Sequence, residues 1–335
     1  MRVLWTTSER IIPFASLIFL TPLAKWLRSE GVEVEIIRTG SLRSPWHINK
    51  AKRKIAAVAH KFDLIHSQYG SACALATMSA TDKPRLFTIR GNDWNLHNET
   101  FHWLWLHTRL ARRFSQMAIV RATKVCAVSW RIFRELQILH PSSKIHYLPT
   151  PVDFSRFRPA TTEKSRDRLS LGIRANPDRI WVLFNSLNLW DPVKRYRLAR
   201  EAIQIAKSKL DLPVELVLAT GIPHEKIPQL TRACDVILST SESEGWPNCI
   251  KEALASGVPF IATDTSDLRI ISERDRRCQI VPPDAHLIAD AIAKFIRGPR
   301  SHNAASLRDH VSTMQLPFIG YELLSIYREI LGEHN

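Results

Sequence analysis

The amino-acid sequence predicts an α/β protein made of two β/α/β domains in series. Its 335 residues exceed one ordinary domain and suit two of about 150 residues each. Short apolar segments typical of strands alternate with segments of helical period, which favours parallel sheets covered by helices on both faces. The alternation breaks at residues 148–159, which are rich in proline. Because such sheets bind ligands at the carboxyl ends of their strands, we expect a ligand crevice there, between the domains.

The first series of predicted strands and helices precedes this break. Residues 2–5 and 85–89 are short apolar runs, and residues 32–38 first alternate and then run apolar. The helical segment 17–30 ends before Gly31, a residue that commonly terminates helices. Further strands are predicted at 64–66 and 124–128, and further helices at 50–61, 102–121 and 130–139.

The second series begins after the break and ends in a helix at 320–331. Its predicted strands are 180–184, 214–219, 236–239, 259–262 and 279–281, and its predicted helices are 197–208, 226–232, 249–256 and 285–295. We therefore predict domains at 1–158 and 159–317. Residues 318–335 are expected to form a helix that packs back on the first domain.

Composition and cysteine usage indicate a folded protein without a membrane span. The hydrophobic share of 45% and the charged share of 24% exclude disordered, collagen-like and coiled-coil proteins. The longest run without a charged residue, 64–81, is too polar for a bilayer span. The apolar run 11–24 contains two prolines and lacks a signal-peptide cleavage site. The five scattered cysteines suggest reduced thiols in a cytoplasmic protein.

Positive charge is concentrated in the first half of the chain. The net charge is +15, and residues 1–160 hold 24 basic and 10 acidic side chains. Such a half is expected to meet an anionic partner, namely nucleic acid, a phospholipid surface or a phosphorylated substrate. A solvated basic surface that only keeps the protein soluble is the alternative.

Several binding and catalytic motifs are missing from the sequence. It contains neither of the glycine-rich phosphate loops, G-x-G-x-x-G and G-x-x-x-x-G-K-[ST]. It also lacks D-x-D, the G-x-S-x-G nucleophile elbow and the H-E-x-x-H zinc motif. We therefore predict no bound metal and no cofactor.

The most informative segment is residues 239–257. A strand is predicted to end at Ser239, a polar loop follows, and a helix begins at about Asn248, a good helix N-cap. The free N–H groups and the positive dipole end of such a helix favour phosphate. Glu244 and Glu252 flank this helix start, where their carboxylates could accept hydrogen bonds from sugar hydroxyls. The alternative is that both acids merely favour a helix N-terminus.

The two glutamates are separated by seven residues within EGWPNCIKEALASGVPFIATD. This segment resembles the Glu-x7-Glu motif of retaining family 4 glycosyltransferases, whose GT-B fold has two Rossmann-like domains facing each other across a cleft. Further segments resemble the same family in the same order, and together they cover nearly the whole chain. They are DLIH at 63–66, TIRGND at 88–93, VCAVS at 125–129, the linker at 145–159 and IVPPD at 280–284.

The resemblance implies roles for residues of the second domain. Glu244 corresponds to the carboxylate that contacts the donor-sugar hydroxyls, and Glu252 to the one that binds the ribose of the nucleotide. Lys194, with Arg195 beside it, corresponds to the lysine that neutralises the donor diphosphate, although it could also be an ordinary exposed charge. Such a cation stabilises a departing nucleoside diphosphate without a metal. The backbone groups implied around the donor belong to Gly245, Trp246, Pro247 and Asn248.

In the first domain the resemblance is looser. Arg90 stands where many family members have a histidine, so Arg90 and Asp93 either orient the donor sugar or the acceptor hydroxyl, or only fix their loop. His66 is expected to face the crevice as a candidate general base, unless the leaving phosphate itself takes the proton. The glycine-rich first loop of the family is replaced by residues 6–16.

The basic half suggests where the acceptor comes from. Stretches 47–61 and 101–134 combine basic residues with apolar residues or tryptophans, a pattern that suits an anionic membrane interface. Partly buried tryptophans with solvated arginines are the alternative.

In this family the first domain usually holds the acceptor. We therefore predict a cytoplasmic protein, peripheral on the inner face of the membrane. It would move a sugar from a UDP- or GDP-sugar to a glycan or lipid-linked acceptor in bacterial-type surface polysaccharide or lipopolysaccharide assembly. The alternatives are another GT-B enzyme, such as a nucleotide-sugar epimerase, and, with less support, a basic nucleic-acid-binding protein.

Overall fold

The computed structural model describes residues 1–8, 19–40, 42, 44–96, 102–141, 144–160, 168, 170–173, 175–298 and 304–332. Most of the loop at 6–16 therefore lies outside the described residues. Contacts divide the chain into two compact units. The first comprises Met1–Pro151, Ser243–Trp246 and Leu316–Asn335, and the second comprises Val152–Glu242 and Pro247–Gln315. The division after Pro151 precedes the predicted boundary after residue 158.

The described part of the first unit holds a parallel sheet of order β2-β1-β3-β4-β5-β6. Its strands are β1 (Arg2–Thr7), β2 (Glu33–Arg38), β3 (Leu64–Ser67), β4 (Arg85–Ile89), β5 (Lys124–Ala127) and β6 (Ile145–Tyr147). Its helices are α1 (Thr21–Ser29), α2 (Pro45–Ala59), α3 (Ser71–Met78), α4 (His102–Arg121), α5 (Trp130–Leu139) and α13 (Leu316–Leu331).

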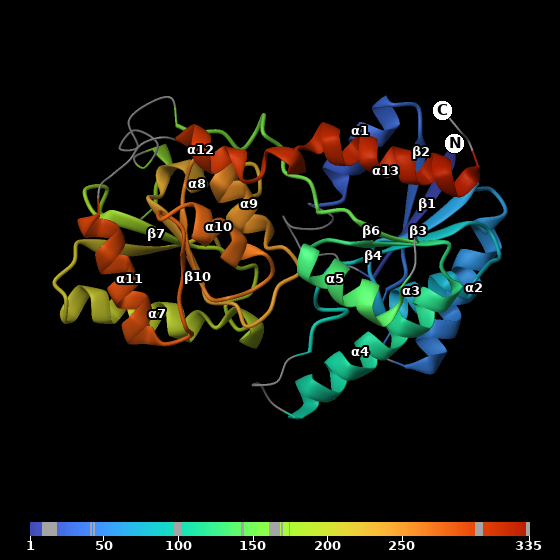
Figure 1. Cartoon of the computed structure of the whole chain (residues 1–335), viewed down its shortest axis with the longest axis horizontal. Coiled ribbons are helices and arrows are strands. Elements are labelled where there is room, and N and C mark those ends of the chain that lie inside the picture. The colour runs from blue at the N-terminus through green and yellow to red at the C-terminus, as the bar shows by residue number, and fades with distance from the viewer. Residues whose placement is uncertain are drawn as a thin grey trace. The chain divides into compact units, whose positions relative to one another are not determined.

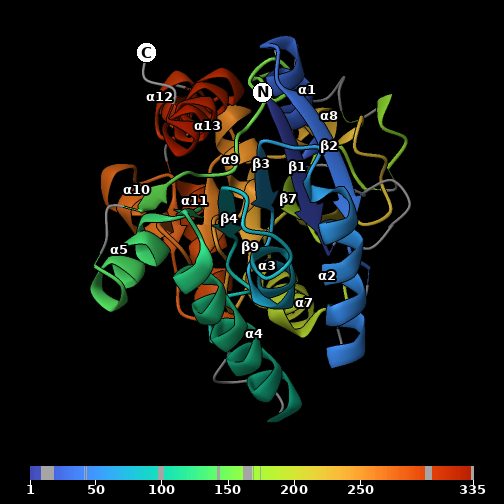
Figure 2. The same ribbon diagram turned by 90° about the vertical axis from the view of Figure 1, so that its right-hand side faces the viewer.

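Helices cover both faces of this sheet because side chains alternate along its strands. Val3 and Trp5 of β1 join the apolar cluster formed with α1 and α13, whereas Leu4 packs with Ile55 of α2. Helices α1 and α13 lie side by side on one face, and α2, α3 and α4 lie on the other (Figures 1 and 2). The C-terminal helix α13 is thus part of the core of the first unit.

Helix α3 was not predicted from the sequence, and its burial explains why. Ala72, Cys73, Ala74 and Ala76 are all buried. A helix that is buried on nearly every side has no polar face, so the period of 3.6 residues that reveals surface helices is missing.

The described part of the second unit holds a parallel sheet of order β11-β10-β9-β7-β8. Helices α7 and α11 cover one face and α8 and α9 the other (Figure 1). Its strands are β7 (Ile180–Phe184), β8 (Val214–Leu218), β9 (Val236–Ser239), β10 (Phe260–Ala262) and β11 (Gln279–Ile280). Its helices are α7 (Tyr196–Ser208), α8 (Ile227–Ala233), α9 (Asn248–Ala255), α10 (Leu268–Arg274), α11 (Ala285–Arg297) and α12 (Ala304–Asp309).

The strand order of the second sheet brings two loops together. Strands β7 and β9 are neighbours in parallel register, with Leu183 opposite Ile237. Their carboxyl ends therefore meet at the same edge of the sheet, and the loops that follow them carry the predicted residues of the second domain.

Candidate active site

A turn after β7 holds Lys194 against the loop that follows β9. The turn is a short 3₁₀ helix, Pro192–Lys194, which the Asp191 side chain caps by accepting a hydrogen bond from the Val193 N–H at 3.0 Å. The hydroxyl of Thr240 donates to the carbonyl oxygens of Lys194 and Arg195 at 2.8 and 3.0 Å. Hydrogen bonds between the two loops thus fix the position of the Lys194 backbone.

Arg195 completes this anchor. Its backbone is left-handed, with φ of 50°, which lets the chain turn sharply into α7. Its guanidinium lies 3.7 Å from the Glu242 carboxylate, and the Glu242 N–H donates to the Val193 carbonyl at 2.8 Å. The Arg195 side chain therefore interacts with the loop that follows β9. Lys194 is the residue that the resemblance assigns to the donor diphosphate.

Helix α9 begins one residue earlier than predicted. Pro247, not Asn248, is the N-cap residue, with extended backbone and no side-chain cap, and Asn248 is the first helical residue. The N–H groups of Ile250 and Lys251 donate to the Pro247 carbonyl at 3.1 and 3.3 Å. Because Asn248 is inside the helix, its Oδ1 cannot cap the first turn. That atom is buried and has no hydrogen-bond partner among the described residues.

Glu252 lies one turn further along α9 and is partly buried. Burial raises the pKa of its carboxyl group to about 7, although the nearby charges of Lys251 and Arg156 lower it. Ionisation of this carboxyl group at neutral pH is therefore less favourable in the folded protein than in water. Hydrogen-bond donors from a ligand would favour the ionised form, which is the behaviour expected of a ligand-binding carboxylate.

The segment Ser243–Trp246, which carries Glu244, is fixed by contacts inside the first unit. The Asn95 side-chain amide donates to Ser243 Oγ at 2.9 Å and to the Glu244 carbonyl oxygen at 3.0 Å. A Cβ atom on Gly245 would lie only 1.8 Å from the Arg90 carbonyl oxygen. Only glycine fits there, so the backbone around Glu244 is constrained on both sides.

Arg90 has its guanidinium held in one orientation. Its Nε donates to the Gln68 carbonyl at 2.6 Å, and its terminal nitrogens donate to Gln68 Oε1 at 2.8 Å and Thr150 Oγ1 at 3.0 Å. The guanidinium carbon also lies 4.5 Å from the centre of the Phe19 ring, a cation–π distance. Arg90 is half-buried and rigid, a geometry that suits a positioned cation.

Asp93 has the loop-fixing geometry. Its buried carboxylate accepts hydrogen bonds from the backbone N–H groups of Gly70, Arg90 and Gly91 at 2.6, 2.9 and 2.8 Å. Burial raises the pKa of Asp93, and these backbone hydrogen bonds counteract the rise. With its oxygens so occupied, Asp93 shapes the loop that presents Arg90.

His66 lies inside the first unit instead of facing an open surface. It is 1% exposed, and its Nδ1 lies 2.7 Å from the Tyr327 hydroxyl while its Nε2 lies 2.9 Å from Thr88 Oγ1. Burial, followed by the charge of Arg90, lowers the pKa of His66 well below its usual value, so the ring is neutral. Both ring nitrogens have internal partners, which removes the expected exposure of a general base and leaves His66 as a support for Gln68 and Arg90.

Two residues of this region were missed at the sequence level. Tyr327 of α13 accepts a hydrogen bond from the Trp5 indole at 2.8 Å and contacts His66, although 261 residues separate Tyr327 from His66. Asn95 reaches Ser243 across 148 residues. No local pattern in the sequence marks such pairs.

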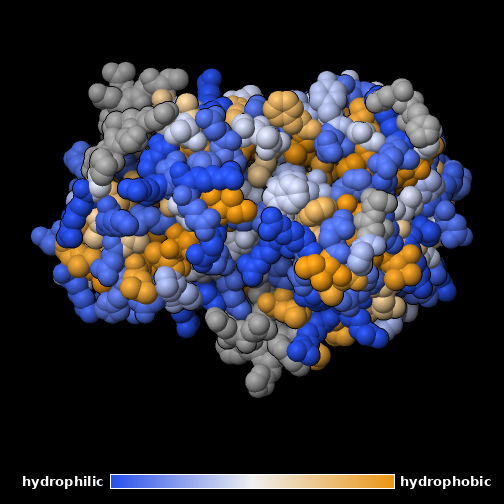
Figure 3. Space-filling view, in the orientation of Figure 1, coloured by the Kyte–Doolittle hydropathy of each residue, from blue (hydrophilic) through white to orange (hydrophobic). Residues whose placement is uncertain are grey.

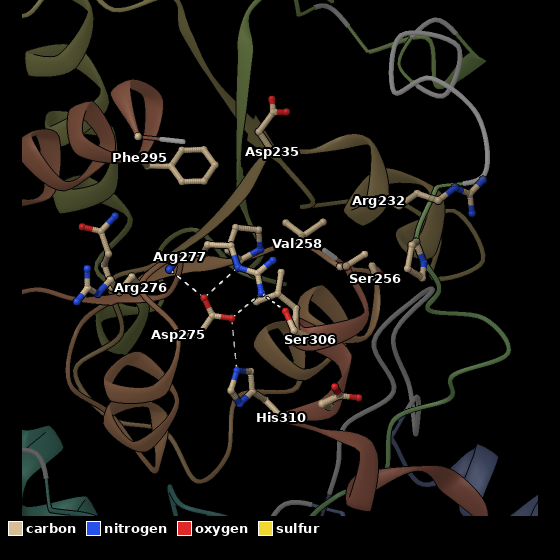
Figure 4. Close-up of a pocket in the computed structure, with 18 of the residues that line it drawn as sticks. Arg232, Asp235, Ser256, Val258, Asp275, Arg276, Arg277, Phe295, Ser306 and His310 are labelled. Atoms are coloured by element: carbon tan, nitrogen blue, oxygen red, sulfur yellow. Dashed lines mark hydrogen bonds and ion pairs between the residues drawn. The ribbon is translucent and has the colours of Figure 1, made fainter. Parts of the chain in front are cut away.

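A large pocket of the second unit lies elsewhere. It lies at the amino ends of strands β7, β9, β10 and β11, has a volume of about 1130 Å³ and contains none of the predicted site residues (Figure 4). Asp275 in it accepts from Arg277 at 2.6 Å and lies 3.5 Å from His310 (Figure 4). Asp275, Arg277 and His310 thus contact one another.

Two family models match the chain. Glycosyl transferases group 1 matches residues 200–309, which include Glu244 and Glu252, and Glycosyltransferase Family 4 matches residues 18–156, which include His66, Arg90 and Asp93. The chain is a family 4 glycosyltransferase.

Curated relatives of this glycosyltransferase carry related names. It is 27% identical over 249 residues to a protein named as the teichuronic acid biosynthesis glycosyltransferase TuaC of Bacillus subtilis, covering 70% of this chain and 61% of the relative. It is 28% identical over 131 residues to the GDP-mannose-dependent alpha-mannosyltransferase of Mycobacterium tuberculosis, covering 38% of this chain and 34% of the relative. The matches therefore span less than two thirds of the length of either relative.

Solved structures confirm the predicted fold of the glycosyltransferase. Sucrose-phosphate synthase from Thermosynechococcus elongatus has a TM-score of 0.79 at 17% identity, with 100% of both chains covered. Anabaena HepE, solved in complex with UDP and glucose, has a TM-score of 0.69 at 17% identity, with 97% of this chain and 98% of that chain covered. These similarities establish two Rossmann-like α/β domains of the GT-B type.

The described residues show neither a cluster of metal ligands nor a membrane-spanning helix. No group of three or more histidine, cysteine, aspartate or glutamate side chains there is arranged to hold a metal ion. None of the helices described is both long and apolar enough to cross a bilayer.

Proposed function

We propose that this family 4 glycosyltransferase is a retaining, metal-independent enzyme that moves a sugar from a UDP- or GDP-sugar to a glycan or lipid-linked acceptor. The observation that carries the proposal is the arrangement at one edge of the second sheet. There the turn with Lys194 is hydrogen-bonded to the loop that leads into α9 and Glu252. A lysine on an anchored backbone, a helix start and a partly buried carboxylate suit a nucleoside diphosphate.

The donor is proposed to bind with its diphosphate at the start of α9 and beside Lys194. Glu252 would accept hydrogen bonds from the ribose hydroxyls, and Glu244, with the backbone of Gly245 to Asn248, would hold the sugar. The name of the mannosyltransferase relative supports a GDP-sugar, and the ligands of the HepE structure support a UDP-sugar.

The proposed reaction breaks the bond between the anomeric carbon and the diphosphate oxygen. The acceptor oxygen forms the new bond on the same face, and its proton passes to the departing phosphate oxygen. Lys194 and the α9 N–H groups stabilise the charge that develops on this leaving group. The enclosed position of His66 supports this route, because that histidine has no ring nitrogen directed to a substrate.

We further propose that the acceptor belongs to a bacterial-type surface polysaccharide or lipopolysaccharide and that the protein works peripherally on the cytoplasmic face of the membrane. The name of TuaC supports an acceptor of this class. Charge on the first unit supports the membrane surface, because α2 and α4 contain lysines and arginines but no acidic residue.

Helix α4 has an exposed stripe that suits a lipid interface. Leu106, Leu110, Met117 and Val120 are exposed and recur at helical spacing, with the exposed Arg113 between them. Hydrophobic and hydrophilic side chains are also interspersed over the helices of the first unit (Figure 3). The side chains of residues 102–105, at the start of α4, lie outside those described.

Vesicle sedimentation tests this surface. We expect binding to vesicles that contain phosphatidylglycerol, no binding to phosphatidylcholine alone, and release by salt. Replacing Met117 and Val120 by serine should weaken binding, whereas Leu287→Ser, at another exposed apolar position on α11, should not. Equal binding to both kinds of vesicle would contradict the proposal.

A screen of nucleotide sugars for transfer or hydrolysis tests the enzymatic proposal. Glu244→Gln should abolish turnover with the accepted donor and leave UDP or GDP binding nearly intact, because Glu244 is assigned to the sugar. Glu201→Gln, on the exposed face of α7, is the matched control. Loss of nucleotide binding in Glu244→Gln would show that the roles of the two glutamates are exchanged.

The alternatives are less well supported. UDP-GlcNAc 2-epimerase from Methanocaldococcus jannaschii shares the fold, with a TM-score of 0.63 at 12% identity, but both matching family models are those of glycosyltransferases. A nucleic-acid-binding role rests on net charge alone.

A further inference from the structure

Arg156 and His224 form a fixed pair in the second unit. One terminal nitrogen of Arg156 lies 3.4 Å from His224 Nδ1. The other lies 3.3 Å from the same atom and donates to the His224 carbonyl oxygen at 3.1 Å. The rings of Phe157 and His224 are 6.5 Å apart. The ring and the backbone carbonyl of His224 therefore position the Arg156 guanidinium.

The pair lies near Glu252. The positive charge of Arg156 is close enough to lower the pKa values of both His224 and Glu252. Arg156, His224 and Glu252 are all partly exposed. The Arg156 guanidinium and the Glu252 carboxylate can therefore both form hydrogen bonds with a polar ligand.

The pair offers hydrogen-bond donors. Burial, followed by the charge of Arg156, lowers the pKa of His224, so its ring is neutral at pH 7. Because Nδ1 accepts from Arg156, the proton of the neutral ring lies on Nε2. Arg156 has five N–H groups, and its contacts to His224 leave some of them for a ligand. A matching ligand edge must therefore present acceptors.

The position of the pair relates it to the nucleoside. His224 follows β8, whose carboxyl end lies beside that of β7 in the sheet. Glu252 is four residues beyond the first residue of α9, which is about 6 Å along the helix axis. With the diphosphate at the helix start, groups near Glu252 lie on the nucleoside side of the ligand.

We propose that Arg156 and His224 recognise the base of the donor nucleotide and select bases that carry carbonyl oxygens, uracil or guanine, over adenine. The inference rests on the proposed function, because it takes the ligand at Glu252 to be a nucleotide. Uracil and guanine present carbonyl acceptors to the two donors. Adenine has no carbonyl group and carries an amino group, which is itself a donor.

Calorimetric titration of UDP, GDP and ADP into the wild-type protein, Arg156→Met and His224→Phe tests the pair. We expect the wild type to bind UDP or GDP at least about 10-fold more tightly than ADP, the discrimination typical of a good pair of base contacts. Each substitution should weaken the preferred nucleotide about 10-fold and leave ADP affinity within about 2-fold. Arg158→Met, an exposed arginine of the same segment, is the control.

Three outcomes would overturn the inference. Equal weakening of all three nucleotides would assign Arg156 to the phosphates, and unchanged affinities would leave the pair without contact to the ligand. Failure of the wild type to bind any nucleotide would remove the proposed function itself, and the inference with it. Arg156→Lys keeps the charge but not the forked geometry, so it provides the same comparison if Arg156→Met does not fold.

Discussion

Glu252 is predicted to reduce the stability of the free protein while serving the ligand. The change to make is Glu252→Gln, which keeps the size of the side chain and removes its charge. In the folded protein burial moves the pKa of Glu252 from 4.5 to about 7. Because the folded-state pKa lies above the unfolded value, ionisation at high pH favours the unfolded chain.

The size of this effect follows from the shift. Each unit of pKa corresponds to about 1.4 kcal/mol, so the penalty at pH 8 is up to about 3 kcal/mol. The free energy of unfolding should fall as pH rises from about 4.5 to about 7 and then level off. Glu252→Gln removes this fall. It should therefore be more stable than the parent protein at pH 8, with little difference at pH 4.

Urea unfolding at pH 4 and pH 8 measures the prediction, with Glu201→Gln on the exposed face of α7 as the control. The control should leave the free energy of unfolding nearly unchanged at both pH values. A Glu252→Gln protein that is no more stable than its parent at pH 8, or equally stabilised at pH 4, would refute the argument from burial. The same variant should bind UDP and GDP more weakly, because an amide replaces the carboxylate proposed to accept the ribose hydroxyls.

Three further substitutions test the described contacts. Gly245→Ala should lower turnover about 100-fold, because its Cβ would overlap the Arg90 carbonyl oxygen and displace the segment with Glu244. Steady-state kinetics measure this effect, with circular dichroism as a check of folding, and normal kinetics would contradict the prediction. Tyr327→Phe should lower the free energy of unfolding by about 1–3 kcal/mol, because the Trp5 indole loses its acceptor, whereas Tyr321→Phe on the exposed side of α13 should have little effect. Asp93→Asn should lower the free energy of unfolding by a similar amount, since one amide oxygen cannot accept from all three N–H groups that the carboxylate binds. Stability equal to that of the wild type would mean that the loop does not depend on these hydrogen bonds.

Much of the fold could be predicted from neighbouring residues alone. Runs such as 85–89 and 180–184 are apolar and short because they are strands covered on both faces, and each proved to be a strand of a parallel sheet. The order of strand, polar loop and helix around Glu244 and Glu252 could likewise be predicted, because backbone preferences act over a few residues. Helix α3 was not, since complete burial erases the periodic signal.

The environment of each candidate side chain depended on residues far away in the chain. The sequence predicts that His66 faces the crevice at the end of its strand. In the structure it is buried, and Tyr327, 261 residues later, contacts it. For Asp93 the sequence leaves open a role with the substrate or in fixing its loop, and the N–H of Gly70, 23 residues earlier, donates to its carboxylate. Hydrogen bonding and burial are set by whichever groups the folded chain brings together, and spacing along a sequence does not encode them. Residue type and local order could therefore be inferred in advance, whereas protonation, orientation and accessibility required the packed chain.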